Sequence, residues 1–542
     1  MTSTDIKKIF LLIPTLLLVI FTLAQHVAPK GWHLQSPNTD SMHGISLNAA
    51  YQFLKNKKST PVIVAVIDGG IDTAQEDLKN VLWHNPKEVQ GNGIDDDHNG
   101  YIDDVYGWNF LGSKDTSMTK TSEEKVRMFY QYKPIFENKQ IDKRKLTIEK
   151  KELFQQWKAA AQAMKVNEEE VQQVFFLEMM AKAIREVDSV IQKAWNTKEY
   201  TAEDLEKYQS VSEDIKKAKA TYIDFVNKLG INNKDMKNTE LIDELDKYIS
   251  GRKEFFDLAK NPPPNYRAQI VKDDVENIND IHYGNNNVMV SNPVHGTHVS
   301  GIIAAQRNNG IGIDGIADNV KIMTIRAVPD GDEYDKDVAL AIRYAVDNGA
   351  KVVNMSFGKY FSPHKKWVDD AVRYAAEKDV LLVHAAGNNG KNTDSARHFP
   401  TGKYFGTNIA APNFIDVGAS SDMLIDSSII AGFSNYGKFS VDVFAPGSRI
   451  YATLPFNKYT FFDGTSMASP VVAGIAALIR SYFPKLTASQ VKSIIIQSVD
   501  TPSIKQRVVK PGTKSEIVSM STLCKSKGIV NAEKAVKLAA KK

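Results

Sequence analysis

The sequence predicts an α/β fold with a mostly parallel sheet covered by helices on both faces, interrupted by an all-α insertion. Residues 61–67 (PVIVAVI) form a nearly unbroken apolar, β-branched run, which is typical of a strand buried on both faces of a parallel sheet. From Gly296 onward, similar runs alternate with stretches of helical periodicity. Residues 113–229 contain no glycine and a single proline, Pro134. Their dense Lys, Glu, Gln and Ala favour long, solvent-exposed helices.

The composition is that of an ordinary globular protein. The 542 residues are 42% hydrophobic and 24% charged, with a formal net charge of +4. These values exclude a collagen-like, disordered or multi-span membrane chain, and the small net charge gives no sign of a nucleic-acid partner. The one cysteine, Cys524, excludes an intramolecular disulfide framework and a thiolate metal cluster.

Residues 1–24 have the pattern of a secretory signal peptide. Lys7 and Lys8 precede an apolar run over residues 9–24, which ends in small residues suited to cleavage. The alternative is an uncleaved membrane anchor, but a spanning helix needs about 20 apolar residues and this run is shorter. We therefore expect an exported protein, periplasmic or extracellular, with no membrane association after signal cleavage.

The rest of the chain is predicted to be one α/β domain split by the insertion. Helical patterning over residues 238–260 stops at three consecutive prolines, 262–264, which mark the end of the helical block. The predicted boundaries are 25–60 for a lead-in, 61–112 and 283–542 for the α/β domain with its C-terminal extension, and 113–282 for the insertion. Within the domain we predict strands at 320–325, 351–355 and 380–385 and helices at 338–347 and 368–378.

Three glycine-bearing segments each carry one reactive side chain. Asp68 ends the first predicted strand, and in open parallel sheets ligands gather at that edge. His295 opens the segment 295-HGTHVSG-301, and Ser466 lies in 464-GTSMASP-470 before an apolar helix. Taken singly, Asp68 could cap a helix, His295 could be a packed core residue and Ser466 could be a helix cap.

Together the three segments have the chain order Asp, His, Ser, which is the order of subtilisin and differs from that of chymotrypsin and of the α/β-hydrolases. The motifs are 64-VAVIDGGID-72, 295-HGTHVSGIIAA-305 and 464-GTSMASPVVAG-474, with 354-NMSFG-358, 385-AAGNNG-390, 433-FSNYG-437 and 444-FAPG-447 between them. In these motifs the chain closely resembles the subtilisin-like (subtilase, peptidase S8) serine peptidases. The resemblance covers about residues 61–110 and 283–498, with a closing 528–536, and implies a subtilisin-like α/β fold.

The resemblance implies a serine endopeptidase that hydrolyses peptide bonds through an acyl-enzyme and needs no cofactor for its chemistry. Ser466 is then the nucleophile, His295 the general base and acid, and Asp68 the group that orients the imidazole. Asn388 takes the position of the side-chain amide that, with the Ser466 backbone N–H, stabilises the oxyanion. His298 is expected to be structural. The implied partners are peptide or protein substrates.

By the same resemblance, an extended peptide substrate adds beside two sheet edges. The substrate-binding residues are Ser356, Phe357 and Gly358 on one edge and Ala385, Ala386 and Gly387 on the other.

Residues 91–104 form a loop rich in glycine, asparagine and aspartate. From Asp95 to Gly100 it matches the first half of a D-x-[DN]-x-[DN]-G calcium loop, whereas position twelve is Tyr106 in place of the usual glutamate. The candidate ligands for a structural Ca²⁺ are Asp95, Asp97, Asn99, Tyr101 and Asp103. The alternative is an acidic, turn-rich surface loop.

Two departures from the subtilase pattern leave alternatives open. Residues 25–60 are too few for the folded pro-domain of many secreted subtilases. The insertion, residues 113–282, is either a solvated decoration or a gate, inhibitor or docking arm with a protein partner. The competing function is a catalytically silent subtilase-fold binding or adhesion protein acting through this insertion. A metallohydrolase using His295 and His298 is excluded because the glutamate of H-E-x-x-H is absent.

Overall fold

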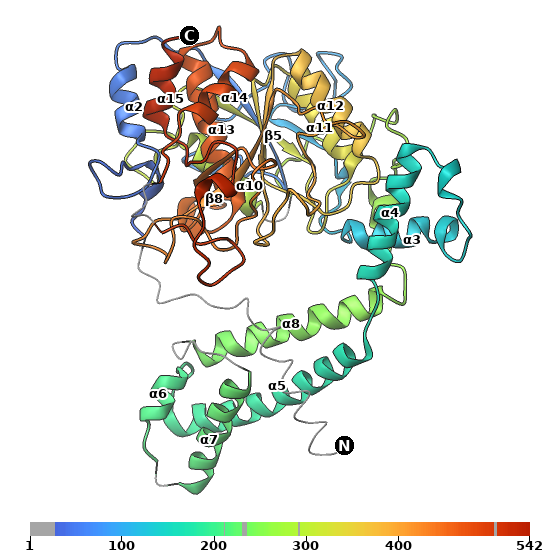
Figure 1. The fold of residues 1–542 in the computed structure, drawn as a ribbon, viewed down its shortest axis with the longest axis vertical. Coiled ribbons are helices and arrows are strands. Elements are labelled where there is room, and N and C mark those ends of the chain that lie inside the picture. Colours follow the sequence, from blue (N-terminus) through green and yellow to red (C-terminus); the bar gives the residue numbers. More distant parts are fainter. Residues whose placement is uncertain (1–27, 211, 230–235, 291–292, 503–506) are drawn as a thin grey trace. The chain divides into compact units, whose positions relative to one another are not determined.

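The computed structural model describes residues 28–210, 212–229, 236–290, 293–502 and 507–542 (Figure 1). The predicted signal peptide, residues 1–24, lies outside these residues. Within them the chain divides into two compact units, one of residues 161–263 and one of the residues up to 160 together with 264–542. No helix in the described part of the chain is both long enough and apolar enough to span a membrane.

The larger unit is built on a seven-stranded sheet in which every neighbouring pair of strands is parallel. The strand order is β2-β5-β1-β6-β7-β8-β9. The strands are β1 (Val62–Asp68), β2 (Gly107–Asn109), β5 (Val320–Arg326), β6 (Val352–Met355), β7 (Leu381–Ala385), β8 (Phe414–Ser420) and β9 (Val443–Pro446). The predicted mostly parallel α/β sheet is confirmed.

Strand β1 shows why its sequence is apolar at almost every position. Val64 and Val66 pack into one hydrophobic core, whereas Ala65 and Ile67 pack into a second core on the other face of the sheet. The first core contains α2 (Leu47–Leu54), α10 (Val294–Ala304), α13 (Thr465–Tyr482), α14 (Ala488–Gln497) and α15 (Ala532–Ala539), and the second contains α11 (Asp335–Asp347) and α12 (Lys365–Glu377). Figure 1 shows these two groups of helices on opposite sides of the sheet.

Smaller elements surround this sheet. They are the antiparallel pairs β3 (Gly112–Ser113) with β4 (Thr116–Ser117) and β10 (Ile450–Leu454) with β11 (Lys458–Phe462), the short helix α9 (Tyr266–Ile270), and single 3₁₀ turns at Trp32–Leu34, Lys143–Lys145 and Met520–Thr522.

The lead-in belongs to the folded core of the larger unit. The Trp32 side chain is fully buried, and its indole N–H donates to the carbonyl oxygens of Ser448 and Arg449, both at 3.1 Å. Helix α2 packs against α15, where the backbone N–H of Ala532 donates to Ile45 O at 2.7 Å. Helices α2 and α15, from opposite ends of this unit's sequence, therefore pack together in one hydrophobic core.

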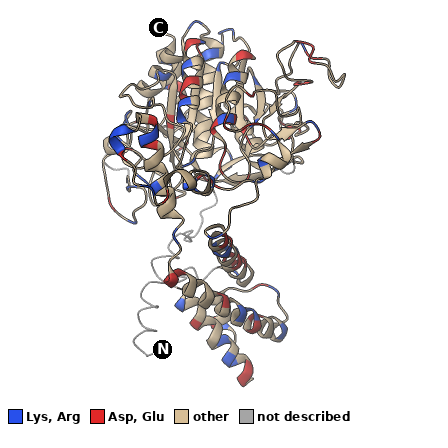
Figure 2. Ribbon diagram, turned by 90° about the vertical axis from the view of Figure 1, so that its right-hand side faces the viewer, with Lys and Arg blue, Asp and Glu red and all other residues tan. Residues whose placement is uncertain are grey.

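The predicted insertion contributes to both units. Its first helices, α3 (Glu124–Phe136) and most of α4 (Ile148–Ala163), belong to the larger unit. The smaller unit contains α5 (Glu168–Trp195), α6 (Ala202–Lys207), α7 (Glu213–Lys228) and α8 (Asn238–Leu258), which share a separate hydrophobic core. Figure 2 shows acidic and basic residues interspersed along these helices, as is typical of solvated helical surfaces.

Candidate active site

Asp68 and His295 form a hydrogen-bonded pair at the carboxyl end of β1. Asp68 is the last residue of the strand and is 3% exposed, and Gly69 N donates to its Oδ1 at 2.7 Å. His295 lies in the first turn of α10, with Nδ1 2.9 Å from both carboxylate oxygens of Asp68. Gly296 permits this approach, because a Cβ there would collide with Gly70 O and lie 3.1 Å from the Asp68 carboxylate. The strand end and the helix start thus meet at a glycine.

The same pairing determines the protonation of the imidazole. Burial alone would lower the pKa of His295, but the charge and hydrogen bond of Asp68 outweigh it and raise that pKa above its ordinary value of 6.5. The His295 side chain is still 44% exposed, so a substrate can reach Nε2. Because Asp68 can only accept from Nδ1–H, it selects the tautomer whose Nε2 is a free base.

Ser466 lies in the first turn of α13, and two hydrogen bonds join it to Ser356. Its Oγ donates to Ser356 O at 3.0 Å, while its own carbonyl accepts from Ser356 Oγ at 2.9 Å. That carbonyl is available because Pro470, four residues on, has no N–H to donate to it. Among the described hydrogen bonds of Ser466 Oγ none goes to His295, because in this rotamer the hydroxyl donates to Ser356 O.

Asn388 is oriented by Thr465, the residue before Ser466. Its Oδ1 accepts from the backbone N–H and from the hydroxyl of Thr465, both at 2.8 Å. Since a backbone N–H can only donate, these bonds fix which end of the amide is oxygen and leave Nδ2 on the other side. A Cβ built on Gly464 would lie 3.5 Å from that nitrogen. Asn388 is exposed, so Nδ2 is an accessible donor next to Ser466.

The two predicted substrate-binding edges follow neighbouring strands. Residues 356–358 continue from the end of β6, and residues 385–387 continue β7. Beneath them the buried His384 lies 2.9 Å from Phe357 O through Nε2 and 2.7 Å from Asp416 through Nδ1. Because Phe357 O can only accept, Nε2 carries a proton, and His384 ties one edge to strand β8.

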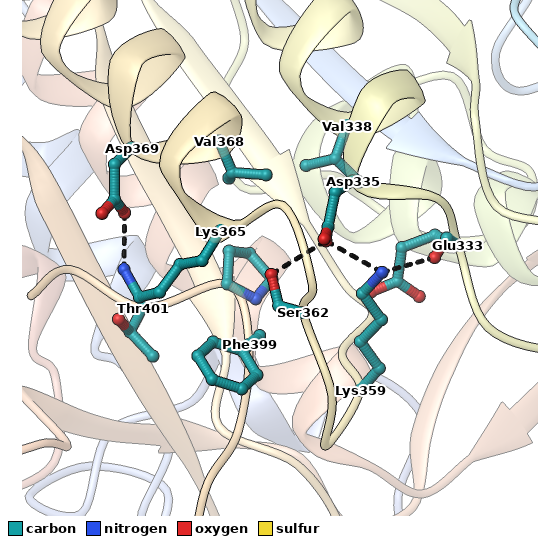
Figure 3. Close-up of a pocket in the computed structure, with 11 residues that line it drawn as sticks. Glu333, Asp335, Val338, Lys359, Ser362, Lys365, Val368, Asp369, Phe399 and Thr401 are labelled. Atoms are coloured by element: carbon teal, nitrogen blue, oxygen red, sulfur yellow. Dashed lines mark hydrogen bonds and ion pairs between the residues drawn. The ribbon is translucent and has the colours of Figure 1, made fainter. Parts of the chain in front are cut away.

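A buried charge cluster fixes the segment that follows Gly358. Lys359 is 2% exposed, and its Nζ lies 2.8 Å from Glu124 Oε2, 2.9 Å from Asp335 Oδ1 and 2.7 Å from Glu333 O. Figure 3 shows the contacts with Asp335 and Glu333. Burial alone would lower the pKa of Lys359, but Asp335 and Glu124 raise it above its usual value. Burial raises the pKa of Glu333 to about 8, so its carboxyl group is neutral at pH 7. Lys359 is therefore the cation that the Glu124 and Asp335 carboxylates share.

Helices α3 and α4 of the insertion hold the same segment. Glu124 comes from α3, and despite burial its pKa is lowered to about 2 by Arg127 and Lys359. From α4, Gln156 both accepts from Ser362 N at 2.8 Å and donates to Ser362 O at 3.3 Å. The base of the insertion is thus joined to the chain just beyond a predicted substrate edge.

The candidate calcium loop brings some of the predicted ligands together. Carboxylate oxygens of Glu88, Asp95 and Asp97 lie within 4.8 Å of one another, and Glu88 Oε2 is buried without a hydrogen-bond partner. Such a set of oxygens fits a hard divalent cation. Asp103 is placed differently, because its two oxygens accept from the backbone N–H groups of residues 91–93. Asn99 Oδ1 likewise accepts from the backbone of Tyr101 at 2.8 Å.

Several contributors to the site have no signal of their own in the sequence. Thr465 could have been identified only by its position before Ser466, and Glu88 stands outside the calcium pattern.

The side chain of His298 is fully buried, with Nε2 3.2 Å from Thr460 O, and burial lowers the pKa of this histidine to about 4. This neutral, packed histidine fits the structural role expected for it.

The chain is similar in sequence to known proteins over most of its length. The subtilase family matches residues 59–516. The chain is 45% identical over 188 residues to the "Thermophilic serine proteinase" of Bacillus sp. (strain AK1), covering 34% of this chain and 42% of that protein. It is 34% identical over 218 residues to the "Cell wall-associated protease" of Bacillus subtilis (strain 168), covering 40% of this chain and 22% of that protein. It is 39% identical over 207 residues to "Thermitase" of Thermoactinomyces vulgaris, covering 38% of this chain and 67% of that protein.

Proposed function

The chain belongs to the subtilase family, and on that premise we propose that it is a serine endopeptidase whose acyl-enzyme forms on Ser466. The observation that supports this most directly is the Asp68–His295 pair, with Nδ1 2.9 Å from both carboxylate oxygens and Nε2 accessible. A neutral imidazole held in this tautomer is the base that a serine hydroxyl needs.

In the first half of the reaction His295 Nε2 takes the proton of Ser466 Oγ as the oxygen attacks the substrate carbonyl carbon. The carbonyl π electrons move to its oxygen, and Asn388 Nδ2 and the Ser466 backbone N–H donate to that oxyanion. The imidazolium, stabilised by Asp68, then protonates the leaving nitrogen as the C–N bond breaks. In the second half, a water activated by His295 hydrolyses the ester and restores Ser466.

Mapping of a covalent adduct tests this proposal. A fluorophosphonate probe should modify the folded protein, and mass spectrometry of the digested adduct should place the phosphorus on the peptide containing Ser466. The same preparation should cleave an unstructured protein such as casein. Labelling elsewhere, or none in a folded sample, would instead favour the catalytically silent binding protein.

The pH dependence of activity should report the Asp68–His295 pair. Because His295 acts as a base only when neutral, kcat/KM should rise with pH as the imidazolium loses its proton. The midpoint should lie above 6.5, since Asp68 raises the pKa of His295 more than burial lowers it. Initial rates on a peptide substrate between pH 5 and 10 measure this midpoint, and a midpoint at or below 6.5 would contradict the assignment.

We propose in addition that the loop around Asp95 and Asp97 binds a structural Ca²⁺. The support is the group of carboxylates that these residues form with Glu88, which has an unpartnered buried oxygen. Chelation with EGTA should lower Tm by several degrees, because a cation at 100 times its Kd stabilises the fold by about 2.7 kcal/mol. Asp97→Asn should remove this sensitivity, and an unchanged Tm in the parent protein would contradict the proposal.

Two further proposals concern the cellular location and the insertion. We infer export to the periplasm or cell exterior from the apolar run of residues 9–24. We take residues 113–282 as an insertion into the catalytic domain, and its helical unit as a candidate surface for a protein partner. The catalytic chemistry described above uses no cofactor.

A further inference from the structure

The imidazole of His398 lies between the two predicted substrate-binding edges. A Cβ built on Gly358 would lie 2.5 Å from His398 Cε1 and 2.6 Å from Nε2. A Cβ built on Gly387, on the other edge, would lie 2.7 Å from the same Nε2. At distances this short, a Cβ on either residue would force the imidazole to move, so glycine on both edges leaves the space that the ring occupies.

The backbone holds His398 in this position. The next residue, Phe399, pairs with Lys359 through two hydrogen bonds, with Lys359 N donating to Phe399 O at 2.9 Å and Phe399 N donating to Lys359 O at 2.8 Å. The ring is backed by His384, whose centroid is 5.2 Å away, and the side chain is only 9% exposed. His398 therefore has little freedom to leave the space between the edges.

The catalytic geometry determines which part of a substrate would meet this ring. Ser466 Oγ lies 3.0 Å from Ser356 O on the first edge, and Asn388 directly follows Gly387 on the second. A carbonyl group attacked by Ser466 and held by Asn388 is thus placed where the two edges meet. The substrate residue that supplies this carbonyl then directs its side chain into the gap between Gly358 and Gly387.

Resting on the endopeptidase function proposed above, we propose that His398 closes this gap and restricts the residue on the acyl side of the cleaved bond to small side chains. Glycine, alanine and serine fit above the ring, whereas leucine, tyrosine and phenylalanine would have to displace it. His398 is then a specificity-determining residue of this chain.

The selection acts through size, because the ring carries no charge near neutral pH. Burial, followed by the neighbouring His384, lowers the pKa of His398 to about 3. A neutral imidazole does not attract acidic side chains as a protonated one would. Acidic residues on the acyl side should therefore gain no advantage over neutral residues of the same size.

A series of blocked peptides that differ only in the acyl-side residue, with a fluorogenic amine as leaving group, tests the proposal. For the full-length protein, kcat/KM should be at least about tenfold higher for alanine than for phenylalanine, since misfit in such a pocket is worth roughly 10–200-fold. His398→Ala should move the alanine-to-phenylalanine ratio toward phenylalanine by a similar factor. His398→Phe, which fills the same space, should keep the preference for alanine, and His84→Ala, an exposed histidine, should leave the ratio unchanged.

Titration with the fluorophosphonate probe counts competent sites in every sample and separates two kinds of failure. If no sample is labelled, the endopeptidase function itself is wrong. If the parent protein is labelled but cleaves the phenylalanine peptide as well as the alanine peptide, the pocket is not closed by His398. If the variants fold and His398→Ala has the same alanine-to-phenylalanine ratio of kcat/KM as the parent protein, the proposal is likewise overturned. If the variants fail to fold, the ratio measured for the parent protein decides alone.

Discussion

Ser466→Ala should lower kcat for peptide hydrolysis by roughly 10⁶-fold, the loss measured for subtilisin when its nucleophile is removed. Without Ser466 Oγ no ester can form, and only the oxyanion donors and substrate binding remain to assist attack by water. Asp68→Asn should cost roughly 10⁴-fold, because an amide at this position no longer requires a proton on His295 Nδ1 and favours the wrong tautomer. Both values are measured as kcat at saturating peptide.

Substitutions at two exposed positions and a combined variant serve as controls for this prediction. Ser493→Ala, at an exposed position of α14, and Asp318→Asn, an exposed carboxylate that accepts from the Tyr482 hydroxyl, should both retain full activity. The combined Ser466→Ala and Asp68→Asn variant should be no slower than Ser466→Ala alone, since the two residues act as a unit. Multiplicative losses, or a Ser466→Ala variant within tenfold of the parent, would contradict the proposed triad.

Lys359→Met should lower the free energy of unfolding by about 3–5 kcal/mol, the cost of leaving buried charges without their partner. Lys359 is the cation shared by Glu124 and Asp335, whose carboxylates are 4% exposed each. Urea denaturation at pH 7 measures the loss. The backbone of Lys359 pairs with Phe399 beside the substrate edge, so KM should rise as well if loss of the ion pairs displaces this segment.

Matched substitutions distinguish burial from charge in this result. Lys366→Met removes an exposed lysine paired with Asp370 and should cost less than about 1 kcal/mol. Adding Asp335→Asn to Lys359→Met should recover part of the stability, because Glu124 keeps its pair with Arg127 whereas the described ion pair of Asp335 is with Lys359. A Lys359→Met variant as stable as Lys366→Met would show that the cluster is not a stabilising one.

The parts of the fold that the sequence predicts well are those with a strong local signal. β1 is apolar on both faces because it separates two cores, so its run of β-branched residues identified it. β5, which pairs with β1 along its whole length, had the same signal. β8 (Phe414–Ser420) is interrupted by Asp416 and Gly418, and β2 has only three residues, so neither has a pattern that stands out.

The base of the insertion was not predictable for a different reason. Glu124 and Arg127 are charged, and charged residues are exposed in most proteins, so a composition rich in them favours solvated helices. In the structure the buried Glu124 and the partly buried Arg127 form an ion pair next to Lys359. Only tertiary structure supplies the partner that makes such burial favourable, and Lys359 is more than 200 residues away in the chain.

The residues of the candidate site also divide into those with a local sequence signal and those without one. Asp68, His295, Ser466 and Asn388 stand in short motifs whose glycines allow close backbone approach, and so the motifs could be read without a structure. His398 lies in no such motif. It reaches the site because its neighbour Phe399 pairs with Lys359, a contact between segments about 40 residues apart.

The packing of α2 on α15 has a consequence for how the chain reaches its folded state. Asn531 Nδ2 donates to Ser46 Oγ at 3.2 Å, and the two residues are 485 positions apart in the chain. At 5–20 residues per second, a ribosome needs roughly 25–100 s to make the second partner after the first. During that time the apolar face of α2 has no α15 to cover it, and this domain cannot finish folding before its last helix is made. A domain that stays open until α15 has been made is suited to crossing a membrane unfolded, as the proposed export requires.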